Sequence, residues 1–214
     1  MSLDSSRAGD TKILLATGNQ AKQGALRWLL EGLPLTAITP EELGISVAPD
    51  EIGDTHQEIA RLKASEWSQA SAMLVIASDG GLVIPALGDS WESRFTHRFA
   101  GAEADDTKRL NLLLELMQPY SGPDRAASWI EAVAIADSGT LLQSWELPGS
   151  TGIITQAPGP QHNVAGFWVF SVWYFPQIGK FYNQLSHQEK DSLDDHWTRL
   201  KDQVQDFFKN LPSL

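Results

Sequence analysis

The spacing of apolar residues predicts that the chain opens with a strand, a polar loop and a helix. A short apolar run over residues 12–16 has the length of a buried strand, and residues 17–19 interrupt it with polar side chains and a glycine. The leucines that follow recur at i, i+3, i+4 and i+7, which is the spacing of one helical face. These leucines are Leu26, Leu29, Leu30 and Leu33.

The pattern continues with a helix and a strand that ends in small polar residues. Thr55 and Glu58 have the spacing of a capping box, which predicts a helix from there to about residue 70. Residues 73–77 form the next strand-sized apolar run, and Ser78-Asp79-Gly80-Gly81 follows as a predicted strand end. Residues 82–87 are expected to resume extended structure.

The second half of the chain adds one helix, a group of strands and a closing helix. Asp105 or Asp106 is expected to cap a helix. Strands over residues 129–136 and 141–146 are predicted to form a hairpin, and residues 167–175 a further strand that is apolar on both faces. The apolar stripe of the closing helix comprises Leu193, Trp197, Leu200, Val204 and Phe207. Early alternation followed by clustered strands favours an α/β fold with a long mixed central sheet flanked by helices.

Composition narrows the class of protein. The 214 residues include 16 Lys and Arg and 27 Asp and Glu, so the formal net charge of −11 argues against DNA or RNA as a partner. A hydrophobic content of 42% supports a folded core, and the absence of cysteine excludes disulfides and thiolate-ligated metals. No apolar run is long enough to span a membrane, and no signal peptide is recognised, so a cytoplasmic location is expected. Residues 1–10 are expected to be a disordered tail, and 11–214 a single domain.

The loop over residues 17–22 is the first candidate for chemistry. Gly18 permits a sharp turn, and the helix that begins behind the loop presents unpaired N–H groups and a positive dipole end. Lys22 adds a full positive charge, so the loop could bind an anion. The alternative is an ordinary strand–helix turn in which Thr17 or Asn19 caps the helix.

Two carboxylates are the next candidates. Glu51 precedes the second helix and is free to reach a metal ion, although a lone glutamate is most often solvated. Asp79 follows a buried strand, and Gly80 behind it leaves room for a ligand. Asp79 could bind a divalent cation or act as a general base, or it could belong to an Asx turn. Two carboxylates and a lysine-bearing loop match the needs of magnesium-dependent phosphate chemistry.

In their order along the chain, these residues resemble the non-canonical purine nucleoside triphosphate pyrophosphatases, the inosine triphosphatase or Ham1-like family. Thr-Gly-Asn-x-x-Lys matches residues 17–22, and Glu-x-Gly-x-Thr-x-x-Glu matches residues 51–58. The family's Ala-Asp-Asp-Ser-Gly-Leu corresponds to residues 77–82, and its Ser-Ala-Arg-Tyr-Ala-Gly to residues 96–101. The order of matches runs from about residue 12 to the C-terminus, nearly the whole chain.

The resemblance implies hydrolysis of a nucleoside triphosphate to the monophosphate and pyrophosphate by a homodimer. It implies that Glu51 and Asp79 hold Mg²⁺, and that Asp79 orients or deprotonates the attacking water. It further implies substrate-binding roles for Thr17, Gly18, Asn19, Lys22, Lys63, Gly80, Arg98, Phe167, Lys190 and His196.

The segments that would read the base depart from the family. In its Gly-Phe-Gly-Tyr-Asp-Pro segment Phe167 is kept, but Trp168 replaces a glycine and Phe170 replaces the aspartate. Its Ser-His-Arg falls on residues 194–196, where His196 matches only after a one-residue insertion and no arginine follows. Altered or relaxed base selectivity is therefore expected. The substituted aromatic residues are also typical of a sheet core or a dimer interface.

The same residues are compatible with two other functions. One is a catalytically impaired relative that serves as a nucleotide-binding or protein-interaction module. The other is a phosphatase-like activity on a different phosphorylated metabolite.

Overall fold

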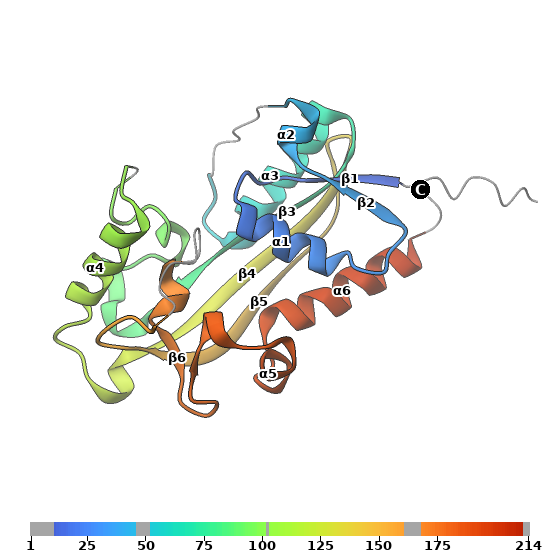
Figure 1. Cartoon of the computed structure of the whole chain (residues 1–214). Coiled ribbons are helices and arrows are strands. Elements are labelled where there is room, and N and C mark those ends of the chain that lie inside the picture. The colour runs from blue at the N-terminus through green and yellow to red at the C-terminus, as the bar shows by residue number, and fades with distance from the viewer. Residues whose placement is uncertain (1–10, 46–51, 102, 161–167, 212–214) are drawn as a thin grey trace, which may run out of the picture. The chain divides into compact units, whose positions relative to one another are not determined.

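The computed structural model describes residues 11–45, 52–101, 103–160 and 168–211, and these contain a seven-stranded mixed sheet (Figure 1). The strand order is β2-β1-β3-β4-β5-β6-β7. β1 pairs in parallel with β2 and β3, whereas β6 pairs antiparallel with β5 and β7. The strands are β1 (Thr11–Leu15), β2 (Leu35–Ile38), β3 (Leu74–Val83), β4 (Ala126–Asp137), β5 (Thr140–Ile154), β6 (Trp173–Phe175) and β7 (Lys180–Phe181). The predicted α/β class with a long mixed sheet flanked by helices is confirmed.

The helices begin at the side-chain caps that the sequence suggests. Asn19, Thr55 and Asp105 each accept hydrogen bonds from backbone N–H groups of the helix that follows. The Glu58 carboxylate does not complete a capping box, because it accepts instead from the Asp54 N–H. The helices are α1 (Gln20–Leu29), α2 (Pro40–Leu43), α3 (His56–Ser71), α4 (Asp106–Leu116), α5 (His187–Ser192) and α6 (His196–Asn210). No helix in the described ranges is both long and apolar enough to cross a membrane.

The chain divides into two compact units, each with its own core. The first comprises the described residues up to Asp79, Ala132–Trp145 and those from Leu200 onward. In its core, α3 packs against β1 and β3, and the small side chains of β4 admit the indole of Trp67. Its buried cluster comprises Leu14, Ala16, Ala60, Ala64, Trp67, Val75, Ala77, Ala132, Ala134 and Ala136.

The second unit comprises Gly80–Glu131 and Glu146–Arg199, and its core is rich in aromatic rings. The single strand predicted over residues 167–175 is wrong: a 3-10 turn, η4 (Trp168–Ser171), precedes the short strand β6. Trp168, Phe170 and Trp173 are all buried in the same core cluster. The segment is apolar at successive positions because it is enclosed on all sides. The core interpretation of these rings is confirmed.

Strand β3 does not end at Ala77 as predicted, because the two glycines continue it rather than break it. A Cβ atom on Gly81 would lie 1.9 Å from the Ser93 carbonyl oxygen, so only glycine admits this close approach. Asp79 is therefore held inside a strand and not in an Asx turn.

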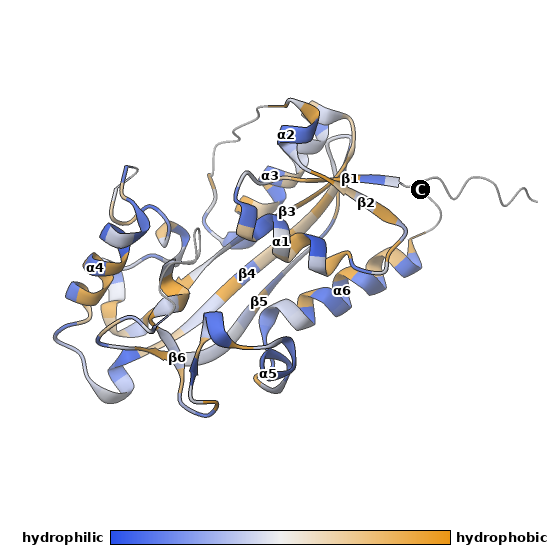
Figure 2. Cartoon of the chain, in the orientation of Figure 1, coloured by the Kyte–Doolittle hydropathy of each residue, from blue (hydrophilic) through white to orange (hydrophobic). Residues whose placement is uncertain are grey.

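The predicted hairpin is confirmed, and its second strand is longer than expected. Ser138 and Gly139 both have positive φ, 48° and 85°, the geometry of a two-residue type I′ turn. β5 then continues to Ile154 without a break. Figure 2 shows both hydrophilic and hydrophobic residues along α6. Of the predicted stripe, Trp197, Leu200 and Val204 are buried and Phe207 is partly buried, whereas Leu193 precedes the helix.

Arg125 supplies a prediction for the second unit. It is buried, and its guanidinium donates to the carbonyl oxygens of Met117, Tyr120, Ile154 and Thr155. Arg125→Met would leave these acceptors unpaired, so we expect the free energy of unfolding to fall by at least about 3 kcal/mol. Urea denaturation followed by tryptophan fluorescence would measure the free energy of unfolding. We expect the value for Arg125→Lys to lie between those of the wild type and Arg125→Met. Wild-type stability in Arg125→Met would contradict the assignment.

Candidate active site

The carboxylate of Asp79 is buried in β3 and held by two side chains of α3. Its Oδ2 lies 2.6 Å from Nδ1 of His56, and its Oδ1 accepts a hydrogen bond from Nζ of Lys63 at 3.2 Å. Asp79 is 7% exposed and His56 is 3% exposed. A buried carboxylate needs such compensation, because its desolvation is costly when it is unpaired.

The environment keeps Asp79 ionised. Burial by itself would raise the pKa of Asp79. The hydrogen bond with His56 and the positive charges of Lys22 and Lys63 act in the opposite direction, and together they lower the pKa below its ordinary value. Asp79 is thus a negatively charged acceptor at neutral pH, as a ligand for a cation or an acceptor for a proton must be.

Helix α3 delivers both partners of Asp79 from one face. Thr55 caps the helix by accepting from the Glu58 N–H at 3.1 Å, which places His56 in the first turn. Lys63 follows about two turns later, where a helix repeats the same face. The sequence analysis selected Lys63 and Asp79 but missed His56, since a lone histidine carries no spacing signal.

The loop over residues 17–22 forms a capped helix start. Asn19 Oδ1 accepts from the N–H groups of Ala21 and Lys22 at 2.9 and 3.2 Å, and the Asn19 N–H donates to Thr17 Oγ1. The Asn19 cap that the sequence offered as an alternative is therefore present. A Cβ on Gly18 would make only ordinary contact, 3.7 Å from a Glu41 oxygen. The charge of Lys22 nevertheless acts on Asp79 and connects the loop with the carboxylate electrostatically.

Two residues were predicted to hold the metal ion, Glu51 and Asp79. Glu51 and Phe167 lie outside the described residues. Within the residues that are described, no group of three or more His, Cys, Asp or Glu side chains could hold a metal ion. Of the two predicted metal ligands, Asp79 lies in the described part of the chain. Its carboxylate oxygens fit Mg²⁺, which binds through one or two carboxylates and completes its shell with water and phosphate oxygens.

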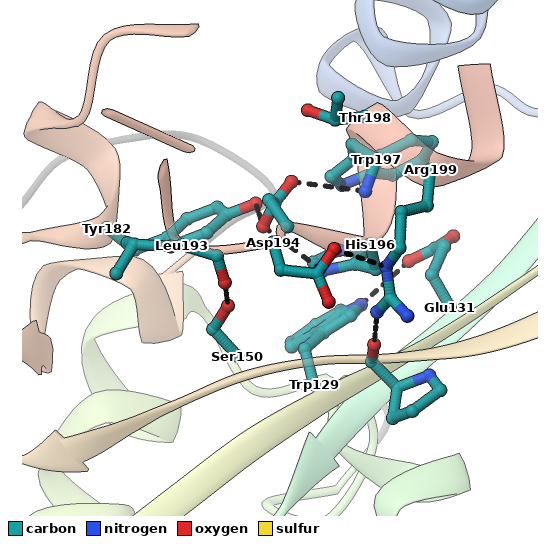
Figure 3. A network of polar contacts seen from close by, with 12 residues as sticks. Trp129, Glu131, Ser150, Tyr182, Leu193, Asp194, His196, Trp197, Thr198 and Arg199 are labelled. Carbon is teal, nitrogen blue, oxygen red and sulfur yellow. Dashed lines mark hydrogen bonds and ion pairs between the residues drawn. The ribbon is translucent and has the colours of Figure 1, made fainter. Parts of the chain in front are cut away.

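The second unit contains a network of polar contacts that includes Tyr182, His196 and Trp197 (Figure 3). Tyr182 donates its hydroxyl to Asp195 Oδ1 at 2.8 Å, and the Trp197 N–H donates to Oδ2 at 3.1 Å. Nδ1 of His196 lies 3.3 Å from Oδ1. Burial would raise the pKa of Asp195, but the contacts with His196 and Tyr182 and the charge of Lys190 lower it.

Lys190 and His196, both predicted to bind substrate, meet at the ring of Tyr182. The imidazole of His196 is fully buried and stacks with Tyr182 at a centroid distance of 6.3 Å and with Trp129 at 6.5 Å. The Lys190 ammonium lies 4.5 Å from the centroid of the Tyr182 ring. Burial lowers the pKa of Lys190, and the charge of Asp195 opposes the shift. The sequence analysis missed Tyr182.

Glu131 fills the space that the sequence analysis left for a ligand beside Gly80. Glu131 is 1% exposed, and its Oε2 accepts from Trp129 Nε1 at 2.7 Å. A Cβ on Gly80 would lie 2.1 Å from that Oε2, so the glycine admits the glutamate. Within the described residues, Oε1 of Glu131 and Nε2 of His196 are buried without hydrogen-bond partners. An acidic residue inside the apolar run 129–136 was a signal that sequence reasoning passed over.

Arg98 lies in the second unit, in the turn after η2 (Ser93–Phe95). Its side chain is exposed, and its guanidinium carbon lies 5.7 Å from the centroid of the Phe95 ring. A guanidinium at the surface can reorient toward an anionic ligand.

Comparison with known proteins places the chain in a family. The family model described as "Ham1 family" matches residues 13–201. The chain belongs to the Ham1 family. Two relatives named dITP/XTP pyrophosphatase, from Yersinia pseudotuberculosis and Escherichia coli K12, are 32% and 31% identical to it, and each alignment covers 89% of this chain and 94% of the relative.

Solved structures of Ham1 proteins share the fold. A HAM1 protein from Coxiella burnetii has a TM-score of 0.76 and 26% identity, and the match covers 94% of this chain and 100% of that one. The Ham1 protein of Staphylococcus aureus, 24% identical with a TM-score of 0.73 over 93% and 98% of the two chains, agrees in fold.

The contact between Gly80 and Glu131 in this Ham1 family member can be tested by a double-mutant cycle. Gly80→Ala would force its new methyl group against Glu131, so we expect a loss of about 1–3 kcal/mol of unfolding free energy. Glu131→Ala should restore only part of the loss, because the new methyl carbon would still lie 2.8 Å from the Ile130 carbonyl oxygen. Gly24→Ala is the control, since nothing lies within 4 Å of a Cβ there. Strict additivity would contradict the contact.

The hydrogen bond between Tyr182 and Asp195 predicts a dependence on alkaline pH. Burial and the charge of Asp195 raise the pKa of Tyr182 well above its ordinary value. The folded state thus retains the phenol proton longer than the unfolded state, and its stabilisation is complete below about pH 10 and lost as pH rises further. Tyr182→Phe should cost about 1–3 kcal/mol at neutral pH, and the difference from wild type should shrink above about pH 10. Urea denaturation at neutral pH and above about pH 10 measures the free energy of unfolding of the two proteins. A difference between them that does not change with pH would contradict the expectation.

Proposed function

We propose that this chain hydrolyses a nucleoside triphosphate to the monophosphate and pyrophosphate with the help of Mg²⁺. The observation that carries the proposal is the buried, ionised Asp79 between Lys63 and His56 and under the charge of Lys22, in a Ham1 family member. Relatives that align over most of this chain are named dITP/XTP pyrophosphatases. Non-canonical purine triphosphates are therefore the first substrates to test.

In this proposal each residue of the first unit has a role that its chemistry supports. Asp79 accepts a hydrogen bond from the attacking water and takes up its proton as the water oxygen forms a bond to the first phosphorus. The bond from that phosphorus to the bridging oxygen breaks, and pyrophosphate leaves with this oxygen. Lys63 and Lys22 attract the negatively charged triphosphate, and the N–H groups at the start of α1 suit an anion. Mg²⁺, held by Asp79 and by the predicted ligand Glu51, would neutralise charge that develops on the phosphate oxygens.

We propose further that the selectivity for the base is altered or relaxed relative to that implied by the family resemblance. Trp168 and Phe170, at positions where the family has a glycine and an aspartate, are enclosed in the core of the second unit. Polar recognition there would fall to other groups, for which Glu131 Oε1 and His196 Nε2 are buried and unpaired candidates among the described residues. A site without the family's polar groups discriminates less strongly between bases. The assembly is proposed to be a homodimer acting on small molecules in the cytoplasm.

A catalytically impaired, nucleotide-binding relative is the second candidate. The observation that favours it is that both oxygens of Asp79 are already engaged, one by His56 and one by Lys63. A cation or a water would share or displace these contacts. Tight binding of nucleotide without hydrolysis would support this candidate over the first.

A nucleotide panel tests the proposal. We expect release of pyrophosphate from dITP or XTP with Mg²⁺ and none after its removal by EDTA. Asp79→Asn should lower kcat at least about 100-fold, the magnitude typical of a lost general base. Coupled pyrophosphate detection and chromatography of the monophosphate measure both. Asp89→Asn, at an exposed site, is the matched control. If folded wild-type protein hydrolyses no nucleotide in the panel, the proposed activity is wrong.

A further inference from the structure

We propose that His56 is the positioning residue of Asp79: it fixes the orientation of the carboxylate that the reaction uses, without touching the substrate itself. The inference rests on the proposed function. The motif that the family resemblance supplies around this position, Thr-x-x-Glu, specifies no residue type at 56, so His56 is a feature of this chain's own structure.

The geometry of the contact is that of a charge-assisted hydrogen bond. An ionised carboxylate can only accept, so the proton between Nδ1 of His56 and Oδ2 of Asp79 belongs to the histidine. The 2.6 Å separation is shorter than that of an ordinary neutral N–H···O bond. Both residues are buried, and a bond of this kind is worth more where water is excluded.

His56 and Lys63 hold different oxygens of the same carboxylate. His56 takes Oδ2 and Lys63 takes Oδ1, which together fix the plane of the group. The two contacts are not equivalent. The imidazole has two side-chain torsions, whereas the lysine side chain has four and is therefore more flexible. The lysine ammonium is also attracted by the negatively charged substrate. His56 is the contact that persists when Lys63 turns toward a phosphate.

The start of α3 is itself anchored, which gives His56 a fixed base. Thr55 caps the helix. Gln57 donates to Oγ of Ser144 at 3.2 Å, and Nε of Arg61 donates to the same hydroxyl at 2.7 Å. These bonds tie the first turns of the helix to β5 within the first unit. The position of the imidazole is therefore set by the fold and not by the ligand.

Fixing the carboxylate has a direct chemical consequence. A carboxylate offers about four lone-pair directions, and His56 and Lys63 occupy one on each oxygen. The remaining directions, toward a water or a cation, are then defined before substrate arrives. Partners that orient a metal-binding or proton-accepting group in this way contribute about 10–100-fold in affinity or activity.

Three substitutions separate positioning from packing. His56→Leu removes the donor. His56→Asn places an amide nitrogen the same number of bonds from Cβ as Nδ1, whereas His56→Gln places it one bond further. We expect His56→Leu and His56→Gln to lower kcat about 10–100-fold while KM changes less than about threefold, and His56→Asn to recover most of kcat. His187→Leu is the matched control, since His187 is also the first residue of a helix, α5, but is exposed.

Binding of Mn²⁺ to the nucleotide-free protein gives a second readout that needs no turnover. Isothermal titration calorimetry should show weaker Mn²⁺ binding by about tenfold in His56→Leu, and recovery in His56→Asn. Thermal denaturation of every variant runs alongside. The proposal would be overturned if His56→Asn and His56→Leu lost kcat and Mn²⁺ affinity equally. It would also be overturned if His56→Leu kept the wild-type kcat and Mn²⁺ affinity.

The two proposals fail in distinguishable ways. If wild-type protein hydrolyses no nucleotide, the proposed function is wrong, and the Mn²⁺ titrations still decide the role of His56. If wild-type protein is active and His56→Leu matches it, only the positioning role is wrong. Should His56→Leu not fold, the comparison of His56→Asn with His56→Gln decides. Recovery of kcat and Mn²⁺ affinity in His56→Asn alone supports the positioning role, and equal values in the two variants overturn it.

Discussion

The burial of one carboxylate is the constraint on which the candidate site depends. An ionised aspartate inside a strand is stable only if charged and hydrogen-bonding partners replace the water it has lost. In the first unit those partners are His56 and Lys63, both on α3. The helix must therefore begin at a defined residue and keep a defined rotation, which explains why its first turns are capped by Thr55 and bonded to Ser144. The pairing with Asp79 and the burial of Ala60, Ala64 and Trp67 thus both depend on the placement of this sixteen-residue helix.

The second unit also buries an aspartate, and the difference between the two is informative. The partners of Asp195 include the phenol of Tyr182 and a backbone N–H, groups that stay in place and carry no charge of their own. The partners of Asp79 include a lysine ammonium, which can exchange a carboxylate for a phosphate without being left unpaired. Asp195 therefore has the surroundings of a structural anchor, whereas Asp79 has those of a group that can exchange one partner for a ligand.

The sequence predicts most elements of the fold, because apolar periodicity and helix caps are local properties. It fails where a long-range contact reverses the local preference. Gly80 and Gly81 have the pattern of a strand end, yet they continue β3 because Glu131 and Ser93 approach their backbone. The site shows the same division: Asp79 and its lysine are found by motif, but His56 lies 23 residues from its partner and no pattern of single residues encodes that pairing.

The residues around Asp79 and the substituted aromatic positions belong to different compact units. Asp79, Lys63 and Lys22 belong to the first unit, whereas Lys190 and His196 belong to the second. Trp168 and Phe170, which stand where the family resemblance has a glycine and an aspartate, are part of the core of the second unit. Neither position is among the groups that shift the pKa of Asp79, because each of those groups lies in the first unit. Loss of the family's base-reading residues is therefore no argument against phosphate chemistry in this chain.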